Sequence, residues 1–194
     1  MGFGMNTTRM TMRMAMRVAS RYLQARKKLA LRVQQLLSLM GEGSHFGVLS
    51  AYTPQSKGKN KQKHSELIRD LQAMGYTRWE PLRGKWEGVA ERSILVPGMS
   101  AQDVFSLGRK YTQDAVIYKS NKSVIGMYYL KGTPRAVVAA DPEGTPLYQY
   151  STDSESELFS KARGLRFEFG FVWTELPWDG KTPLGIRDIM KASL

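Results

Sequence analysis

The apolar positions after residue 45 alternate between short strand-like runs and two segments with helical spacing. Phe46 to Tyr52 is almost wholly apolar, which predicts a strand, whereas Leu67, Ile68 and Leu71 share one face of a helix that Gly75 ends. The predicted elements over this stretch are a strand at 46–52, a helix at 61–74, a strand at 76–86, a strand at 92–96, a helix at 101–111 and a strand at 114–118.

This order of elements, β-α-β-β-α-β over residues 46–119, predicts an α+β fold with a ferredoxin-like core. Further strands are expected to extend the antiparallel sheet at 123–130, 135–140 and 165–174. Short surface helices are expected at 153–162 and 184–192. Residues 42–194 would form one domain.

Single residues refine three of these elements. Pro81 cannot donate a ladder hydrogen bond, so the strand at 76–86 is predicted at an edge of the sheet. Ser100 and Asp103 have the spacing of a capping box, which predicts where the second helix begins. Aromatic residues at 167, 169, 171 and 173 alternate, which favours one buried face of a single strand.

The chain before residue 42 has a different pattern. Thr7 or Thr8 can cap a helix that extends to about Met40, and its apolar face is intermittent until residue 29. Arginines at every fourth position form one stripe on that helix, where like charges repel. Residues 1–41 are therefore predicted to be a basic extension, helical or disordered.

Charge separates this extension from the rest. The chain has a formal net charge of +12, and its first acidic residue is Glu42. Residues 1–41 hold +8 of that excess. Four interpretations remain open: a solvated extension, a nucleic-acid-binding arm, an address or packaging segment such as an organelle transit peptide, and a membrane-surface helix.

A second basic segment, SKGKNKQK, leads into the first predicted helix of the domain. Lysine charge together with backbone N–H groups at a helix start can bind phosphate, although a solvated loop is the alternative. The predicted nucleic-acid-binding residues in the two segments are Arg9, Arg13, Arg17, Arg21, Arg26, Lys27, Lys28, Lys57, Lys59, Lys61 and Lys63.

The amino-acid composition excludes several kinds of site. The chain has no cysteine and only two histidines, which excludes disulfides, thiolate metal sites and a cysteine nucleophile. We therefore expect no metal and no cofactor. No apolar run approaches the roughly 20 residues that a membrane span needs.

A polar pocket is the main alternative to a charged surface. Glu91 and Ser93 alternate along a strand and so face one side of the sheet, and Gln113 precedes the strand after the second helix. Together with Thr53 they are expected to line one pocket that recognises a base edge or a small nucleotide. In a catalytic version Glu91 would be the general base, with His64 as the alternative. Polar groups paired with backbone at strand ends are the competing interpretation.

Several motifs in order resemble an uncharacterised family, the domain of unknown function DUF3293. These are FGVLSAYTP, an Asn60 before a helix, MGY, Gly84, ERSILVPGMS and LGRKYTQDAVIY, over residues 46–130. Thr53 departs from the family's usual Asn. The resemblance covers under half of the chain and implies no agreed activity, but the family's frequency in phages favours a phage protein.

The leading hypothesis is a non-enzymatic phage or bacterial accessory protein that binds nucleic acid or another polyanion through its basic arm. The second hypothesis is a virion-associated protein that docks to a phage structural protein through residues 1–41. The third is a small nucleotide-like ligand-binding domain or enzyme that uses the pocket. The expected location is a bacterial host cytoplasm or a virion. The sequence does not predict the oligomeric state.

Overall fold

The computed structural model describes residues 45–56, 58–86, 89–120, 124–139, 148–149, 159–162, 165–169, 172–185 and 187–188. All of these residues belong to the unit Leu39–Leu194. This part of the chain has a mixed α/β fold, in which an antiparallel sheet is accompanied by two α-helices. The predicted extension and its helix lie outside the described residues, as do the turns expected near residues 121–122 and 141–144.

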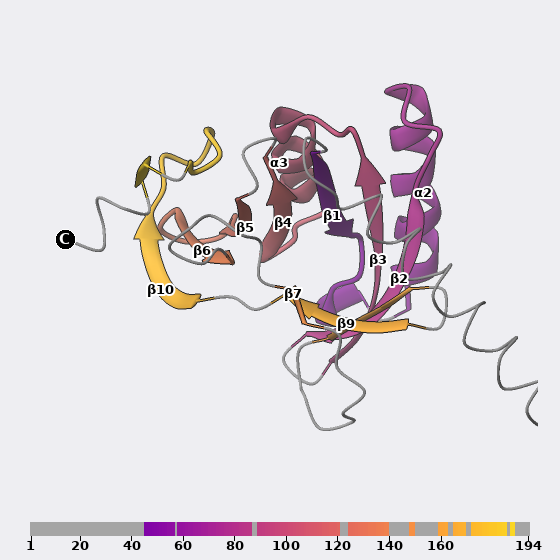
Figure 1. Cartoon of the computed structure of the whole chain (residues 1–194). Coiled ribbons are helices and arrows are strands. Elements are labelled where there is room, and N and C mark those ends of the chain that lie inside the picture. The colour runs from indigo at the N-terminus through magenta and orange to yellow at the C-terminus, as the bar shows by residue number, and fades with distance from the viewer. Residues whose placement is uncertain are drawn as a thin grey trace, which may run out of the picture. The chain divides into compact units, whose positions relative to one another are not determined.

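The strands pair in the order β10-β6-β5-β4-β1-β3-β2-β8-β9-β7, and every neighbouring pair is antiparallel (Figure 1). Their bounds are β1 Phe46–Ser50, β2 Glu80–Trp86, β3 Val89–Pro97, β4 Ala115–Lys119, β5 Ile125–Tyr129, β6 Arg135–Ala139, β7 Tyr148–Gln149, β8 Phe159–Ala162, β9 Leu165–Phe169 and β10 Val172–Pro177. The strands predicted at 123–130 and 135–140 are confirmed as β5 and β6.

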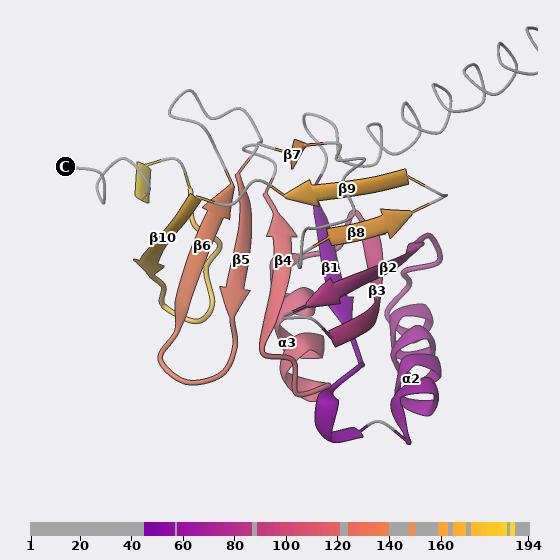
Figure 2. The same ribbon diagram turned by 90° about the horizontal axis from the view of Figure 1, so that it is seen from below.

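Both helices, α2 (Asn60–Ala73) and α3 (Ala101–Lys110), pack on the same face of the sheet. At Gly47 of β1, a Cβ atom would lie 2.3 Å from a side-chain carbon of Val104 in α3, so strand and helix approach closely. Figure 2 shows the helices on one side of β1, β3 and β4 and the β8–β9 hairpin on the other.

The main core lies between the helices and that face. Leu67 and Leu71 of α2 and Phe105 of α3 are almost fully buried there, together with Ile94 and Val96 of β3. Side chains alternate between the two faces of a strand, so the intervening residues of β1, β3 and β4 face away from the helices.

The predicted start of α3 is confirmed. The Ser100 hydroxyl accepts a hydrogen bond from the Asp103 backbone N–H at 3.1 Å, which satisfies one of the free donors of the first turn. Tyr76 extends this cap, because its hydroxyl donates to the Asp103 carboxylate at 2.6 Å. The chain that follows α2 is thereby fixed to the beginning of α3.

The two helices end in the same type of turn. After α2 the Tyr76 N–H donates to the Leu71 carbonyl and the Gly75 N–H to the Gln72 carbonyl, which is a Schellman motif with Gly75 at φ +89°. After α3 the Gln113 N–H donates to the Gly108 carbonyl and the Thr112 N–H to the Arg109 carbonyl. The left-handed position of this second motif holds Thr112, at φ +54°.

The prediction of an edge position for the second strand is wrong. β2 pairs with β3 on one side and with β8 on the other. The β8 pairing involves only Arg83, Gly84 and Lys85, so Pro81 lies beyond that ladder and is not required to donate a hydrogen bond to β8.

Two predictions near the C-terminal end also need correction. The single strand expected at 165–174 is two strands, because β9 pairs with β8 and β7 whereas β10 pairs with β6. The helix expected at 153–162 is contradicted at its end, where residues 159–162 form β8. Of the helix expected at 184–192, Arg187 and Asp188 are helical, Leu184 and Gly185 are not, and the remaining residues lie outside the described ranges.

Candidate functional site

A cavity of about 470 Å³ lies at the end of the sheet where β1 finishes and β4 begins. Most of its sheet residues come from the face opposite the helices, because Ser50 pairs with Ser93 and Val48 pairs with Ile117. Leu49 and Val116 also line it, although they belong to the core cluster that contains the helices. Ser50, Ser93 and Ala115 are small, so they leave space between the strands and the loops around them. The volume lies within the range of small-molecule sites, which is roughly 300–1,000 Å³.

The loop from β1 to α2 forms one wall, and the side chain of Asn60 holds it in place. Asn60 Oδ1 accepts from the Thr53 N–H and Asn60 Nδ2 donates to the Thr53 carbonyl, both at 3.1 Å. Because Asn60 is also the first residue of α2, this double contact fixes the helix start beside the cavity. Tyr52 and Pro54 line the same wall.

The turn after α3 forms the opposite wall. Gln113 is 5% exposed, and its Nε2 donates to the Tyr52 carbonyl at 3.2 Å, which joins the two walls above β1. Thr112 and Asp114 also line the cavity. Asp114 is paired with Lys131 at 2.5 Å, an exposed contact.

Two carboxylates, Glu91 and Asp114, line the cavity, and Glu91 is the more buried of the two. Burial raises the pKa of Glu91 above its usual range, the Ser50 hydroxyl opposes that rise, and the charge of Asp114 adds to it. Perturbed carboxyl groups in a cavity are frequent at functional sites.

The structure brings together four of the five residues of the predicted pocket, Thr53, Glu91, Ser93 and Gln113. The fifth, His64, is not part of the lining, and its ring instead lies edge-on to that of Tyr52 at 5.8 Å. Burial lowers the pKa of His64, and the charge of Arg92 reinforces this. Whether these residues bind a ligand stays a prediction.

Sequence reasoning did not identify Tyr52, Asn60, Thr112 or Asp114 as lining residues. The sequence marks Asn60 only as a residue before a helix, because its contact with Thr53 spans seven positions. Thr112 left no signal, because a left-handed position after a helix is recognised in a sequence by Gly or Asn.

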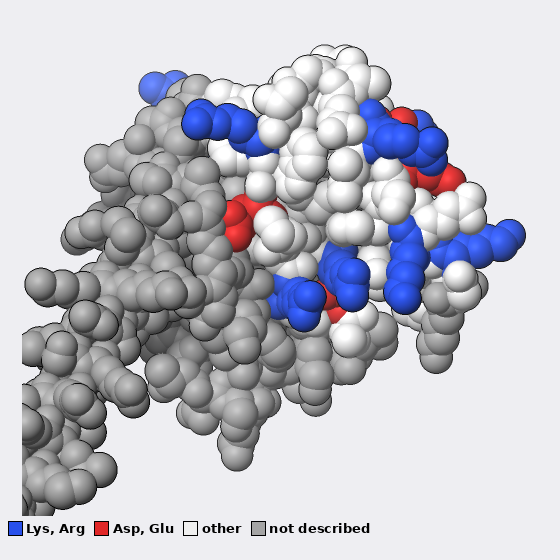
Figure 3. Space-filling model, turned by 90° about the vertical axis from the view of Figure 1, so that its right-hand side faces the viewer, with Lys and Arg blue, Asp and Glu red and all other residues white. Residues whose placement is uncertain are grey.

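The predicted basic residues of the domain lie at the start of α2. Lys59 and Lys61 are exposed, and Lys61 also lines the cavity. Lys63 donates to the Ser56 hydroxyl at 2.8 Å and so stabilises the loop. Figure 3 faces the side that carries α2 and shows more Lys and Arg than Asp and Glu on the described surface. Lys57 and the seven predicted cations before residue 42 lie outside the described residues.

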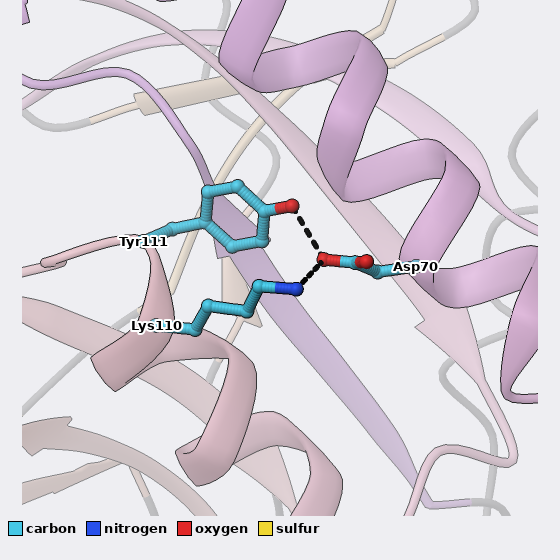
Figure 4. Close-up of polar contacts among 3 residues, drawn as sticks. All are labelled: Asp70, Lys110 and Tyr111. Carbon is cyan, nitrogen blue, oxygen red and sulfur yellow. Dashed lines mark hydrogen bonds and ion pairs between the residues drawn. The ribbon is translucent and has the colours of Figure 1, made fainter.

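A second polar cluster lies where the two helices end. Asp70 of α2 accepts hydrogen bonds from the Lys110 ammonium at 2.7 Å and from the Tyr111 hydroxyl at 2.5 Å (Figure 4). These three residues do not line the cavity. The cluster therefore serves to join α2 to α3.

Two further observations limit the chemistry of the described residues. No group of three or more His, Asp or Glu side chains in these ranges is placed to hold a metal ion. Within the same ranges, no helix has the length and apolar character that a membrane crossing requires.

The lining falls almost entirely within one segment of the chain. Apart from Val48, Ile117 and Met127, every lining residue lies between residues 49 and 116. No curated protein matches the chain. The predicted family resemblance is confirmed, because residues 49–116 match the family described as protein of unknown function, DUF3293.

Proposed function

We propose that the domain binds a small nucleotide-like ligand in the cavity beside Glu91. The observation that carries this proposal is the convergence of Thr53, Glu91, Ser93 and Gln113 on one cavity of about 470 Å³. Val48, Ile117 and Met127 add an apolar side, and an apolar site with a few placed polar groups suits a planar heterocycle.

Binding is favoured over catalysis because the two acid–base candidates are separated. Glu91 lines the cavity, whereas His64 lies behind Tyr52. Lys61 supplies a cation at the cavity, where a phosphate or carboxylate of the ligand would be attracted.

Thermal unfolding of the full chain with a panel of nucleosides and nucleotides tests this proposal. A ligand present at about 100 times its dissociation constant should stabilise the fold by about 2.7 kcal/mol. Gln113→Ala should abolish the shift, while Gln72→Ala, an exposed residue of α2, should preserve it. A panel without any shift, or a shift that Gln113→Ala leaves unchanged, would contradict the proposal.

We also infer that the central part of the sheet is ferredoxin-like. The order β4-β1-β3-β2 with both helices on one face supports this assignment, since it is the arrangement expected of a β-α-β-β-α-β chain. A solved structure with a different order of these strands would contradict it.

A second candidate function is nucleic-acid binding by the basic extension, supported by eight cations and no acid in residues 1–41. Neutralised phosphates release counterions, so the affinity should fall steeply as salt rises. Labelled single- and double-stranded DNA and RNA would be titrated with the full chain over a salt series.

Charge reversal of Arg9, Arg13, Arg17 and Arg21 should remove most of that salt dependence. Charge reversal of Lys59 alone should reduce the slope by about one phosphate contact. Absence of binding by the wild type would eliminate this candidate and would favour docking to a phage or virion structural protein.

A further inference from the structure

Several polar side chains of the cavity already form hydrogen bonds within the fold. Gln113 Nε2 donates to the Tyr52 carbonyl, Asn60 Nδ2 to the Thr53 carbonyl and the Ser50 hydroxyl to the Arg92 carbonyl at 2.8 Å. These contacts engage one donor each of Gln113, Asn60 and Ser50 at the end of β1.

Two acceptors of the cavity, the Glu91 carboxylate and Gln113 Oε1, have no such contact among the described residues. Glu91 forms no ion pair among the described residues. The Ser50 hydroxyl lies beside it, but its proton is donated to the Arg92 carbonyl. Gln113 Oε1 likewise has no hydrogen-bond partner in the described part of the chain. A half-buried carboxylate without a cation is costly unless something else compensates it.

The two acceptors approach the cavity from opposite sides of β1. Glu91 belongs to β3 and Gln113 precedes β4, and these two strands flank β1 in the sheet. The charged groups around Glu91 are Asp114 and Lys61 in the lining, Arg92 beside it on β3, and His64 of α2 behind Tyr52. Asp114 carries the same charge as Glu91, so it adds to the cost of an ionised Glu91, although Asp114 itself is paired with Lys131.

We propose that the ligand of this cavity presents two adjacent N–H donors, as a guanine base or a guanidinium group does, to the Glu91 carboxylate. The proposal rests on the proposed function and specifies its ligand class. A carboxylate accepts such a pair in a bidentate contact, which is stronger than a single neutral hydrogen bond. Gln113 Oε1 accepts from a further donor of the same ligand.

Isothermal titration of the full chain with guanosine, inosine and methylguanidine tests the class of ligand. Inosine lacks the exocyclic amino group of guanosine and is otherwise nearly the same shape. We expect guanosine to bind at least about tenfold more tightly than inosine, because a site built for a donor rejects the analogue that lacks it. Methylguanidine binding without guanosine binding would assign the site to a guanidinium instead of a base.

Glu91→Gln tests the residue itself. The variant keeps the size of the side chain and replaces a charged acceptor by an amide, so guanosine affinity should fall at least about tenfold. Glu66→Gln is the matched control, because Glu66 is on α2 outside the lining and accepts from Gln62. Guanosine affinity should change less than about twofold in that variant.

Titration of guanosine and methylguanidine into the wild type at several pH values tests the role of Glu91 without a substitution, and so also applies if Glu91→Gln does not fold. Guanosine and methylguanidine do not change charge between pH 5 and pH 8, so a carboxylate acceptor predicts weaker binding as Glu91 becomes protonated. Stronger binding at low pH would show that Glu91 donates, and would overturn the proposal.

Two results distinguish a failure of the donor-pair proposal from a failure of ligand binding by the cavity. Equal binding of guanosine and inosine, abolished by Gln113→Ala, would overturn the donor-pair proposal and leave the cavity as a ligand site. No thermal shift or heat of binding with any nucleoside, nucleotide or methylguanidine would overturn both.

Discussion

The ends of α2 and α3 have the same hydrogen bonds but different residues at the left-handed position. Gly75 occupies it after α2, at φ +89°, and Thr112 occupies it after α3, at φ +54°. A β-branched residue in this conformation is strained, whereas Gly adopts it freely. The difference is that the end of α3 forms a wall of the cavity and the end of α2 does not.

The strained conformation of Thr112 therefore lowers the stability of the fold at the candidate site. Strained residues in known proteins cluster where they bind ligands or catalyse reactions. Thr112 lies directly before Gln113, whose side chain crosses to the Tyr52 carbonyl. A Gly at position 112 would permit the same turn without this strain.

The largest expected effect comes from placing the strained residue at the unstrained helix end. Gly75→Thr should destabilise the fold by about 2 kcal/mol, because a β-branched residue would be forced into the left-handed region. Urea unfolding measures the change. Gly58→Thr is the control, since Gly58 has open space for a Cβ atom and no positive φ. Equal effects in both variants would remove the conformational explanation.

The start of α3 and the end of α2 could be predicted from the sequence, whereas the end of α3 could not, for a physical reason. The Ser100–Asp103 cap and the stop at Gly75 depend on local residue types, so they can be recognised within a few positions. The turn at Thr112 depends on packing of the α3–β4 segment, which no local pattern contains. Strand alternation likewise placed Glu91 and Ser93 on one face, but it could not show that residues 165–174 divide between two pairing partners.

Relief of the strain at the cavity is the next effect in size. Thr112→Gly should stabilise the fold by about 0.5–1 kcal/mol, because the gain from the left-handed position exceeds the larger entropy of glycine in the unfolded chain. Urea unfolding measures it without ligand. The thermal shift produced by a bound nucleoside should decrease in the same variant. A variant that is less stable than the wild type would mean that the Thr112 side chain supports the fold.

The contact between the two helix ends gives an effect of similar or smaller size. Burial alone would raise the pKa of Asp70, but hydrogen bonds from Lys110 and Tyr111 outweigh it and hold that pKa below its usual range. A depressed carboxyl pKa contributes stability above the unfolded-state value, and this contribution is lost as pH falls through the folded-state value. Tyr111→Phe removes one of the bonds and should cost about 0.5–1 kcal/mol at neutral pH.

Unfolding of the wild type and of Asp70→Asn from pH 7 down to pH 2 checks the sign of this coupling. The wild type should lose more stability in the acid range than the variant does. The control is Asp188→Asn, at an exposed residue of the C-terminal region. Its free energy of unfolding should fall with pH as that of the wild type does, because Asp70 is still present. Parallel curves for wild type and Asp70→Asn would show that the carboxylate does not join the helices.

The two serines that face each other across β1 and β3 include the smallest expected effect, that of Ser93→Ala. Ser50 donates to the Arg92 carbonyl and accepts from the Tyr52 N–H, so Ser50→Ala should cost about 1 kcal/mol. Ser93 forms no hydrogen bond among the described residues through its hydroxyl, and Ser93→Ala should change stability by less than about 0.5 kcal/mol. Urea unfolding of both variants distinguishes a hydroxyl that supports the fold from one that is available to a ligand. A loss above about 1 kcal/mol in Ser93→Ala would show that this hydroxyl is already paired within the fold and is not free for a ligand.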